Sequence, residues 1–139
     1  MMFVDAIRRY VEALPPESVG WLAGLRDRHV GRALAALHAD PARDWTMDAL
    51  AREAAISRSS LYDRFVQLVG QPPMQYLTQW RMQVAARLLR EGHGTVASVA
   101  LEVGYDSEAA FARAFKRQTG LPPAAWRRAS RGTAAMTAS

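Results

Sequence analysis

The chain has 139 residues, contains no cysteine and carries a formal net charge of +5, with a pI near 10.4. A chain of this length holds one ordinary domain or two small ones, which leaves no room for an elaborate catalytic scaffold. The lack of cysteine excludes disulfides, thiolate metal sites and cysteine nucleophiles. No run approaches the roughly 18 apolar residues of a membrane span, and the first residues lack the apolar segment of a secretory signal. We therefore expect a globular, cytoplasmic protein with no membrane partner.

The excess positive charge is confined to the last third of the chain. Residues 1–45 and 46–106 each carry six Arg against six acidic residues, so both segments are neutral. Residues 107–139 carry five Arg and one Lys against a single Glu. This asymmetry favours a polyanionic partner such as DNA or RNA. The alternative is a basic tail that serves only solubility.

The first part of the chain is predicted to be helical. Apolar residues recur at intervals of three and four, and no stretch alternates as a strand would, so we predict an all-α fold. Residues 1–26 form a helical extension that is interrupted by a Pro-Pro pair. Asp27 is predicted to cap the next helix, which stops near Pro41.

The middle of the chain is predicted to contain two short helices and one long helix. Thr46 caps a helix of about two turns; Ser57 caps the next one, a role we favour over that of a nucleophile, and Gly70 ends it. These elements complete a first subdomain over residues 27–73. A linker helix then covers residues 74–91, and at 1.5 Å per residue it makes a rod of about 27 Å.

The rest of the chain repeats this layout in a second subdomain over residues 92–130. Thr95 caps a short helix, a tight turn follows, and Ser107 caps another helix. A last short helix begins after Pro122. Residues 131–139 are predicted to be a flexible tail.

Two segments, SRSSLYDRFVQLVGQPP and SEAAFARAFKRQTGLPP, share one skeleton. Each follows a short helix and a turn built on a small residue, which is the layout of a helix-turn-helix. One instance would be weak evidence, because many helical hairpins look alike. Two copies in register predict a pair of helix-turn-helix units. The shared positions are Ser57, Leu61, Phe65, Gly70, Pro72 and Pro73 in the first copy, and Ser107, Phe111, Phe115, Gly120, Pro122 and Pro123 in the second.

The outward positions of the two repeated helices are candidate DNA contacts. If the shared apolar residues face the core, the outward positions are Ser59, Tyr62, Asp63 and Val66 in the first copy, and Ala109, Ala112, Arg113, Lys116 and Arg117 in the second. Arg113 can bind guanine O6 and N7, and Ala109 or Ala112 can touch a thymine methyl group. Lys116 and Arg117 suit phosphates.

The first copy offers a different chemistry from the second. Asp63 can only accept hydrogen bonds, so it favours a cytosine amino group. Ser59 and Tyr62 can contact either base edges or backbone. Arg58 lies at the start of its helix, where its charge and the N–H groups suit a phosphate.

Residues 27–129 resemble the DNA-binding domain of the AraC/XylS family of bacterial transcription regulators. The resemblance is carried by Arg81, Met82, Ala85, Leu88 and Leu89, and by the run VASVALEVGYDSEAAFARAFKRQTGLPPAAWRR. It implies two helix-turn-helix units bridged by a helix, with recognition helices at residues 57–69 and 107–119.

The same resemblance implies a function. It implies sequence-specific binding to double-stranded promoter DNA, RNA polymerase as a further partner, and neither catalysis nor a cofactor. It adds Arg81 and Glu108 to the candidate DNA contacts. Residues 1–26 resemble the final helices of a cupin-type sensor domain, and we expect them to pair with such a domain or with a second copy of the chain.

The histidines and two of the tryptophans are interpreted as structural residues. His29, His38 and His93 lack metal-ligand spacing, so we expect them at surface or capping positions. Trp80 and Trp126 are predicted to be core anchors rather than base-stacking residues.

Two other classes of function are compatible with parts of the sequence. Helix-turn-helix pairs also occur in DNA-repair enzymes beside an alkyl-accepting cysteine, but a chain without cysteine cannot perform that chemistry. A helical interaction module, whose basic C-terminal third binds an acidic protein, remains an alternative to DNA binding.

Overall fold

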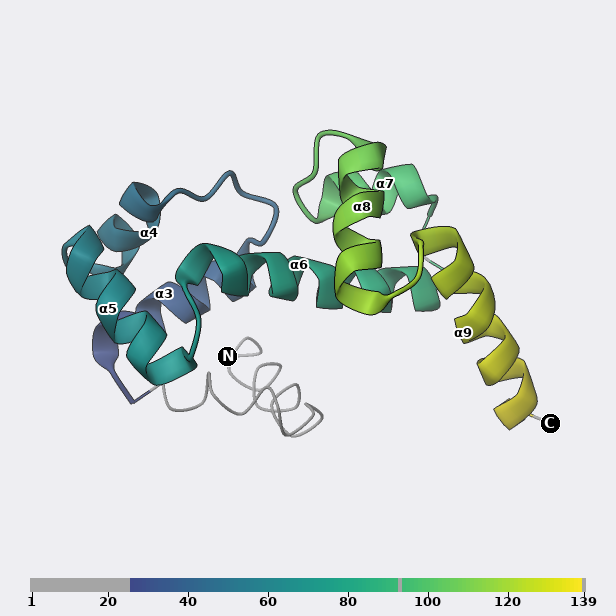
Figure 1. Cartoon of the computed structure of the whole chain (residues 1–139), viewed down its shortest axis with the longest axis horizontal. Helices are drawn as coiled ribbons and strands as arrows, with labels where there is room; N and C mark the ends of the chain where they lie inside the picture. The colour runs from purple at the N-terminus through teal and green to yellow at the C-terminus, as the bar shows by residue number, and fades with distance from the viewer. Residues whose placement is uncertain (1–25, 93, 139) are drawn as a thin grey trace. The chain divides into compact units, whose positions relative to one another are not determined.

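A computed structural model describes residues 26–92 and 94–138, with side chains described up to residue 130. These residues form helices joined by turns and contain no strand, which confirms the predicted all-α fold (Figure 1). The helices are α3 (Arg28–Ala39), α4 (Met47–Ala54), α5 (Arg58–Val69), α6 (Pro73–Arg90), α7 (Val96–Glu102), α8 (Glu108–Thr119) and α9 (Pro123–Ala138). The helical extension expected over residues 1–26 lies almost wholly outside the described residues.

The described chain divides into two compact units. Unit 1 contains residues 26–37 and 46–73, and unit 2 contains residues 38–45 and 74–138. Segment 38–45, which contains the end of α3 and the loop that leads to α4, therefore packs with the later half of the chain. The sequence predicts this segment as part of a continuous first subdomain.

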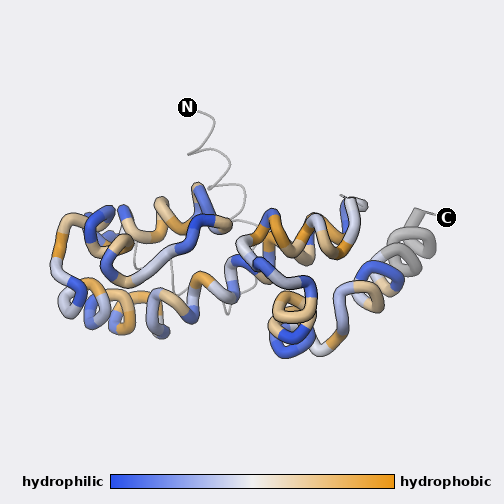
Figure 2. Tube along the Cα trace, turned by 90° about the horizontal axis from the view of Figure 1, so that it is seen from above, coloured by the Kyte–Doolittle hydropathy of each residue, from blue (hydrophilic) through white to orange (hydrophobic). Residues whose placement is uncertain are grey.

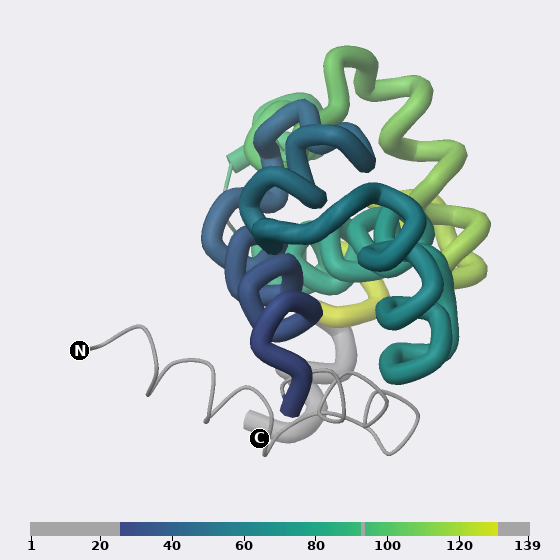
Figure 3. The backbone as a smooth tube through the Cα atoms, turned by 90° about the vertical axis from the view of Figure 1, so that its left-hand side faces the viewer, coloured from purple at the N-terminus to yellow at the C-terminus, as the bar shows by residue number. Residues whose placement is uncertain are grey.

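Unit 1 is built from α3, α4 and α5, whose path runs from purple to teal in Figure 3. The carboxylate of Asp27 accepts hydrogen bonds from the backbone N–H groups of His29 at 2.8 Å and Val30 at 3.1 Å, which confirms the predicted cap. His29 Nδ1 lies 2.7 Å from the carbonyl oxygen of Ala54 and ties α3 to the end of α4. The buried apolar side chains are Val30, Ala33, Leu34, Leu37, Leu50, Ala51, Ala54, Leu61 and Phe65.

Unit 2 is organised around α6, which runs for 18 residues as the predicted linker helix. Its core joins residues from three helices: Met82, Ala85 and Leu89 of α6, Val99, Ala100 and Val103 at α7, and Phe111 and Phe115 of α8. Trp126 of α9 packs against this cluster, with its ring 5.9 Å from that of Phe115, and its Nε1 donates to the carbonyl of Ala86 at 3.3 Å. The prediction of Trp126 as a core anchor is confirmed.

Apolar and polar residues alternate along the helices instead of gathering in long apolar runs (Figure 2). Among the described residues, no helix is both long enough and apolar enough to cross a membrane. The last helix differs from the short one that the sequence predicts, because α9 continues through 16 residues. Six of its 16 residues are alanine, the best helix former.

Candidate nucleic-acid interface

The two helix-turn-helix turns share one backbone geometry. In each, a residue shortly after the end of the first helix has a positive φ, and the N–H of the next residue donates to a carbonyl five residues earlier. The residues are Ala55 (φ 61°), Ile56 and Ala51 in the first turn, with N···O 3.3 Å, and Gly104 (φ 96°), Tyr105 and Ala100 in the second, with 2.9 Å. A left-handed residue followed by this bond is a common way to end a helix and redirect the chain.

The ends of the two recognition helices, α5 and α8, also match. The hydroxyl of Ser57 accepts from the N–H of Ser60 at 3.2 Å, and the hydroxyl of Ser107 accepts from the N–H of Ala110 at 3.2 Å. Both serines are therefore N-caps, as predicted. Gly70 and Gly120 end the helices with φ of 93° and 87°. On the inner faces, Leu61, Phe65, Phe111 and Phe115 are fully buried.

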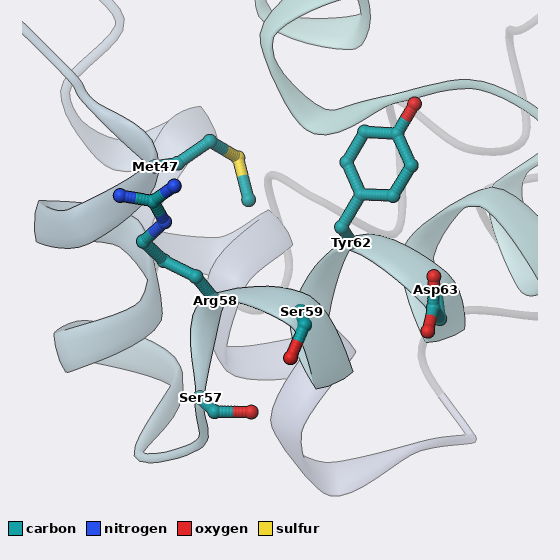
Figure 4. A pocket seen from close by; sticks show the side chains of 6 residues that line it. All are labelled: Met47, Ser57, Arg58, Ser59, Tyr62 and Asp63. Carbon is teal, nitrogen blue, oxygen red and sulfur yellow. The ribbon is translucent and has the colours of Figure 1, made fainter.

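The outer face of α5 exposes four of the predicted contact residues. Arg58, Ser59, Tyr62 and Asp63 are all exposed, and Tyr62 keeps 45% of its surface accessible. They line a hollow of about 590 Å³ together with Ser57 and Met47. Figure 4 shows Met47 and Arg58 on one side of this hollow and Tyr62 and Asp63 on the other.

Met47 is a part of this face that the sequence does not reveal. It is the first residue of α4, one position after the cap Thr46, and nothing in its spacing to α5 indicates that the two would meet. The hollow needs the folded turn to bring the start of α4 beside α5. Pairing of α4 and α5 could be predicted from the helix-turn-helix pattern, but not which side chain of α4 would line the surface.

The cations of α5 lie close to carboxylates. Arg58 Nη1 is 3.3 Å from a carboxylate oxygen of Asp48, and Arg64 Nη1 is 3.4 Å from one of Asp27. The partners of the first pair are 64% and 62% exposed, so water screens the interaction and it contributes little to stability. With Asp63 also exposed, the outer face of α5 offers mixed charge and several hydrogen-bonding groups.

The outer face of α8 is basic. Arg113, Lys116 and Arg117 are exposed there, beside exposed Glu108 and Ala109, while Ala112 is half-buried between them. Three cations against one carboxylate leave a net positive surface on one helix. Small alanines between long cations allow a backbone to approach another surface closely.

Arg81 is on neither recognition helix. It belongs to α6 and is half-buried, and its guanidinium donates to the carbonyl oxygens of Pro41 at 2.7 Å and Arg43 at 2.9 Å. Burial lowers the pKa of Arg81. Arg127 similarly donates to the carbonyl oxygens of Leu89 at 3.3 Å and Gly94 at 2.6 Å. Part of the positive charge of the last third therefore supports the fold.

The described residues hold no group of three or more His, Asp or Glu side chains placed to bind a metal ion. Two helix-turn-helix units, each with a capped recognition helix and an exposed polar outer face, define a double helix-turn-helix nucleic-acid-binding domain. Residues 50–129 match the family described as "Helix-turn-helix domain". The chain belongs to the AraC-type members of that family, which are DNA-binding transcription regulators and not enzymes.

Relatives and solved structures agree with this assignment. The chain is 52% identical over 128 residues to an AraC-like transcription regulator of Streptomyces lividans, covering 92% of this chain and 42% of the relative. It is 37% identical over 131 residues to the regulator AlkR of Acinetobacter baylyi, covering 94% and 42%. The chain thus spans less than half the length of these relatives.

Among solved structures, the DNA-binding domain of the global transcriptional factor AdpA, crystallised with a target DNA, matches with a TM-score of 0.72 and 33% identity. The match covers 77% of this chain and 96% of that one. A DNA-binding transcriptional dual regulator from Escherichia coli K-12 matches with a TM-score of 0.70 and 26% identity, covering 78% and 96%.

Proposed function

We propose that this chain binds double-stranded promoter DNA in a sequence-specific manner by placing α5 and α8 in successive major grooves. The observation that carries the proposal is the pair of recognition helices, whose apolar faces are buried and whose outer faces expose hydrogen-bonding and cationic side chains. The likeness to a domain crystallised with its target DNA supports it. The proposal expects the two recognition helices to lie about one DNA turn, about 34 Å, apart when bound.

The two helices have different tasks in this proposal. On α8, Arg113 reads guanine, Ala109 and Ala112 approach thymine methyl groups, and Lys116 and Arg117 bind phosphates. The exposed Glu108 accepts from a base amino group at the start of that helix.

On α5, Ser59, Tyr62 and Asp63 read base edges, and Arg58 approaches a phosphate from the helix start. The proximity of Arg58 to Asp48 lowers its contribution, because a phosphate must compete with that carboxylate. We therefore assign most of the electrostatic affinity to α8.

The biological setting belongs to the same proposal. The chain acts in the cytoplasm of a bacterium as the DNA-binding part of a transcription regulator and works with RNA polymerase at promoters. Residues 1–25, which lie outside the described residues, are proposed to connect to a sensor domain of the cupin type or to pair with a second copy. Sedimentation of the chain with and without residues 1–25 tests the pairing.

A salt series tests DNA binding itself. DNA sites selected by the purified chain from a random pool are titrated in gel shifts between 50 and about 300 mM salt. We expect retardation at low salt, with log K falling linearly in log salt by about 0.9 for each phosphate contacted. If no selected duplex is retarded at low salt, the proposal fails and an acidic protein becomes the better partner for the basic residues 107–139.

A further inference from the structure

The guanidinium of Arg81 is the centre of a small cluster within unit 2. Its Nε donates to the carbonyl of Pro41 at 2.7 Å and its Nη2 to the carbonyl of Arg43 at 2.9 Å. Its Cζ lies 5.9 Å from the ring centre of Tyr105. Hydrogen bonds from a charged donor are stronger than neutral ones, and burial of the group increases the cost of breaking them. Arg81 therefore fastens segment 38–45 to α6 beside the second helix-turn-helix turn.

An independent contact places the same segment against that turn. A Cβ atom added to Gly104 would lie 3.1 Å from both the Cα and the carbonyl oxygen of Ala42, and 3.1 Å from Nη2 of Arg81. Gly104 also has a φ of 96°, which side chains rarely adopt. Glycine is needed here both for the backbone conformation and for the approach of segment 38–45.

Segment 38–45 has internal support of its own. Trp45 is only 7% exposed, and its Nε1 donates to the carbonyl of Asp40 at 2.8 Å. The guanidinium carbon of Arg43 lies 4.2 Å from the centre of the Trp45 ring, a cation–π distance. The segment thus has the packing and hydrogen bonds to present the carbonyls of Pro41 and Arg43 to Arg81 as a preformed pair.

The cluster reaches the recognition helix through Tyr105. The Tyr105 ring lies 5.7 Å from that of Phe111, the fully buried residue in the first turn of α8. The N–H of Tyr105 donates to the carbonyl of Ala100 in the turn bond at 2.9 Å. Any displacement of Tyr105 therefore acts on both the turn and the N-terminal half of α8, where the base-reading positions begin.

We propose that Arg81 is a positioning residue for DNA recognition by α8, and that it acts through segment 38–45 and Tyr105 without touching DNA. This inference rests on the proposed DNA binding and assigns Arg81 a different role from the direct contact that the sequence suggests. Two carbonyl oxygens and the Tyr105 ring already engage the guanidinium, so a phosphate contact would fall to the remaining N–H groups of a half-buried side chain. Holding the turn requires only the bonds already present.

Charge removal distinguishes the two roles. Arg81→Met is compared with Arg90→Met, which removes one positive charge from an exposed position of the same helix. Both are titrated against the DNA site selected by the wild-type chain, across salt and against each single-base variant of that site. We expect Arg81→Met to keep the wild-type salt slope and to lose roughly tenfold discrimination at the base pairs read by α8, a loss comparable to one base contact. Discrimination at the pairs read by α5 stays unchanged.

The opposite pattern would overturn the inference. A phosphate contact predicts a slope reduced by about 0.9 and equal weakening on every sequence. Arg81→Lys then keeps the slope and most of the affinity, because an ammonium serves a phosphate well. A positioning role predicts that Arg81→Lys resembles Arg81→Met, since a single ammonium cannot reproduce the planar fork that reaches both carbonyls.

A second pair of variants tests the cluster without changing charge. Gly104→Ala pushes against Ala42 and Arg81, whereas Gly92→Ala imposes a similar strain at φ 77° where no atom lies within 4 Å. We expect Gly104→Ala, and not Gly92→Ala, to reproduce the loss of discrimination at the pairs read by α8. Equal behaviour of the two glycine variants would show that the segment does not control α8.

Hydrogen exchange gives a readout that needs no DNA. The N–H of Trp45 donates to the carbonyl of Arg43 at 2.8 Å, and that of Tyr105 reports the turn. Faster exchange at both amides in Arg81→Met, with the helices of unit 1 unchanged, supports the inference; unchanged exchange at both contradicts it. Absence of DNA binding by the wild-type chain is a separate result, because it removes the proposed function while the exchange data still report the cluster.

Discussion

Nε2 of His38 lies 2.5 Å from the hydroxyl oxygen of Tyr76, so the end of α3 and the first turn of α6 are linked by one hydrogen bond. The His38 ring also packs 4.3 Å from that of Trp80. The sequence suggests a surface or capping position for this histidine; the structure instead half-buries it between aromatic side chains, and the prediction is wrong for His38. Burial disfavours the charged imidazolium and lowers the pKa of His38 to about 4.

This pKa predicts an acid-sensitive fold. In the unfolded chain His38 titrates near 6.5, so between pH 6.5 and about 4 the unfolded state binds a proton that the folded state does not. The contribution of neutral His38 to the free energy of unfolding is therefore fully present above pH 6.5. It is lost as the pH falls towards 4, which lowers the free energy of unfolding by up to about 3 kcal/mol. Urea titrations at pH 7, 6, 5 and 4.5 measure the loss.

His38→Gln is the matched control, because an amide can still bond the Tyr76 hydroxyl and does not titrate. We expect a flatter pH dependence between 6.5 and 4.5 in this variant, with His29 and His93 unchanged. Asp27 does not contribute to the pH dependence in this range. Its pKa is lowered from 3.8, mainly by the N–H of Val30, so its contribution to the free energy of unfolding is lost only below pH 4.5. Parallel pH curves for both chains would show that His38 is not the cause.

Ala55 carries backbone strain that a single substitution removes. It ends α4 with φ 61° and ψ 38°, a left-handed conformation that costs an L-residue about 1–2 kcal/mol relative to glycine. Part of that gain is offset by the larger entropy of glycine in the unfolded chain. We expect Ala55→Gly to raise the free energy of unfolding by about 0.5–1 kcal/mol.

Ala49→Gly provides the comparison in the first turn of the same helix, where glycine should cost up to about 1 kcal/mol. Denaturant midpoints of the two variants should move in opposite directions. A loss of stability in Ala55→Gly would mean that the turn is held by its surroundings and not strained by its φ.

The skeleton of the fold could be predicted because its determinants are local. Ser57 and Ser107 cap helices through bonds to residues only three positions away, and Phe65 and Phe111 follow helical spacing into the core. The role of Arg81 could not be predicted in this way. Its acceptors are backbone carbonyls about 40 positions away, and a carbonyl leaves no trace in the residue types.

The same limit applies to the turns and to the hollow beside α5. A positive φ at position 104 could be predicted because the residue is glycine. Ala55 also adopts a positive φ, but alanine is not a residue type that predicts one. Met47 looks like an ordinary first-turn residue until the turn brings it beside α5. Sequence spacing orders residues along one element, but contacts between elements depend on the crossing that the turn creates.

The N-cap residue of α8, Ser107, should contribute to the free energy of unfolding as an ordinary N-cap does. Ser107→Ala removes the acceptor for the N–H of Ala110, and we expect a loss of about 1 kcal/mol in the free energy of unfolding. Ser60→Ala is the control, since Ser60 is an exposed serine on α5 that caps nothing with its side chain. Equal effects of both changes in thermal denaturation would contradict a capping role for Ser107.

Arg113 and Lys116 lie on the same exposed face of α8, but we expect their substitutions to change DNA binding in different ways. Arg113→Ala removes a planar fork suited to guanine O6 and N7, so discrimination at one base pair should fall by about 1–3 kcal/mol while other positions are unaffected. Lys116→Ala removes a point charge near the backbone, so all sequences should weaken together and the salt slope should fall by about 0.9. Competition titrations on the selected site and its single-base variants separate these outcomes. A uniform loss for Arg113→Ala would make it a phosphate contact and leave base reading on α8 to Glu108 and the two alanines.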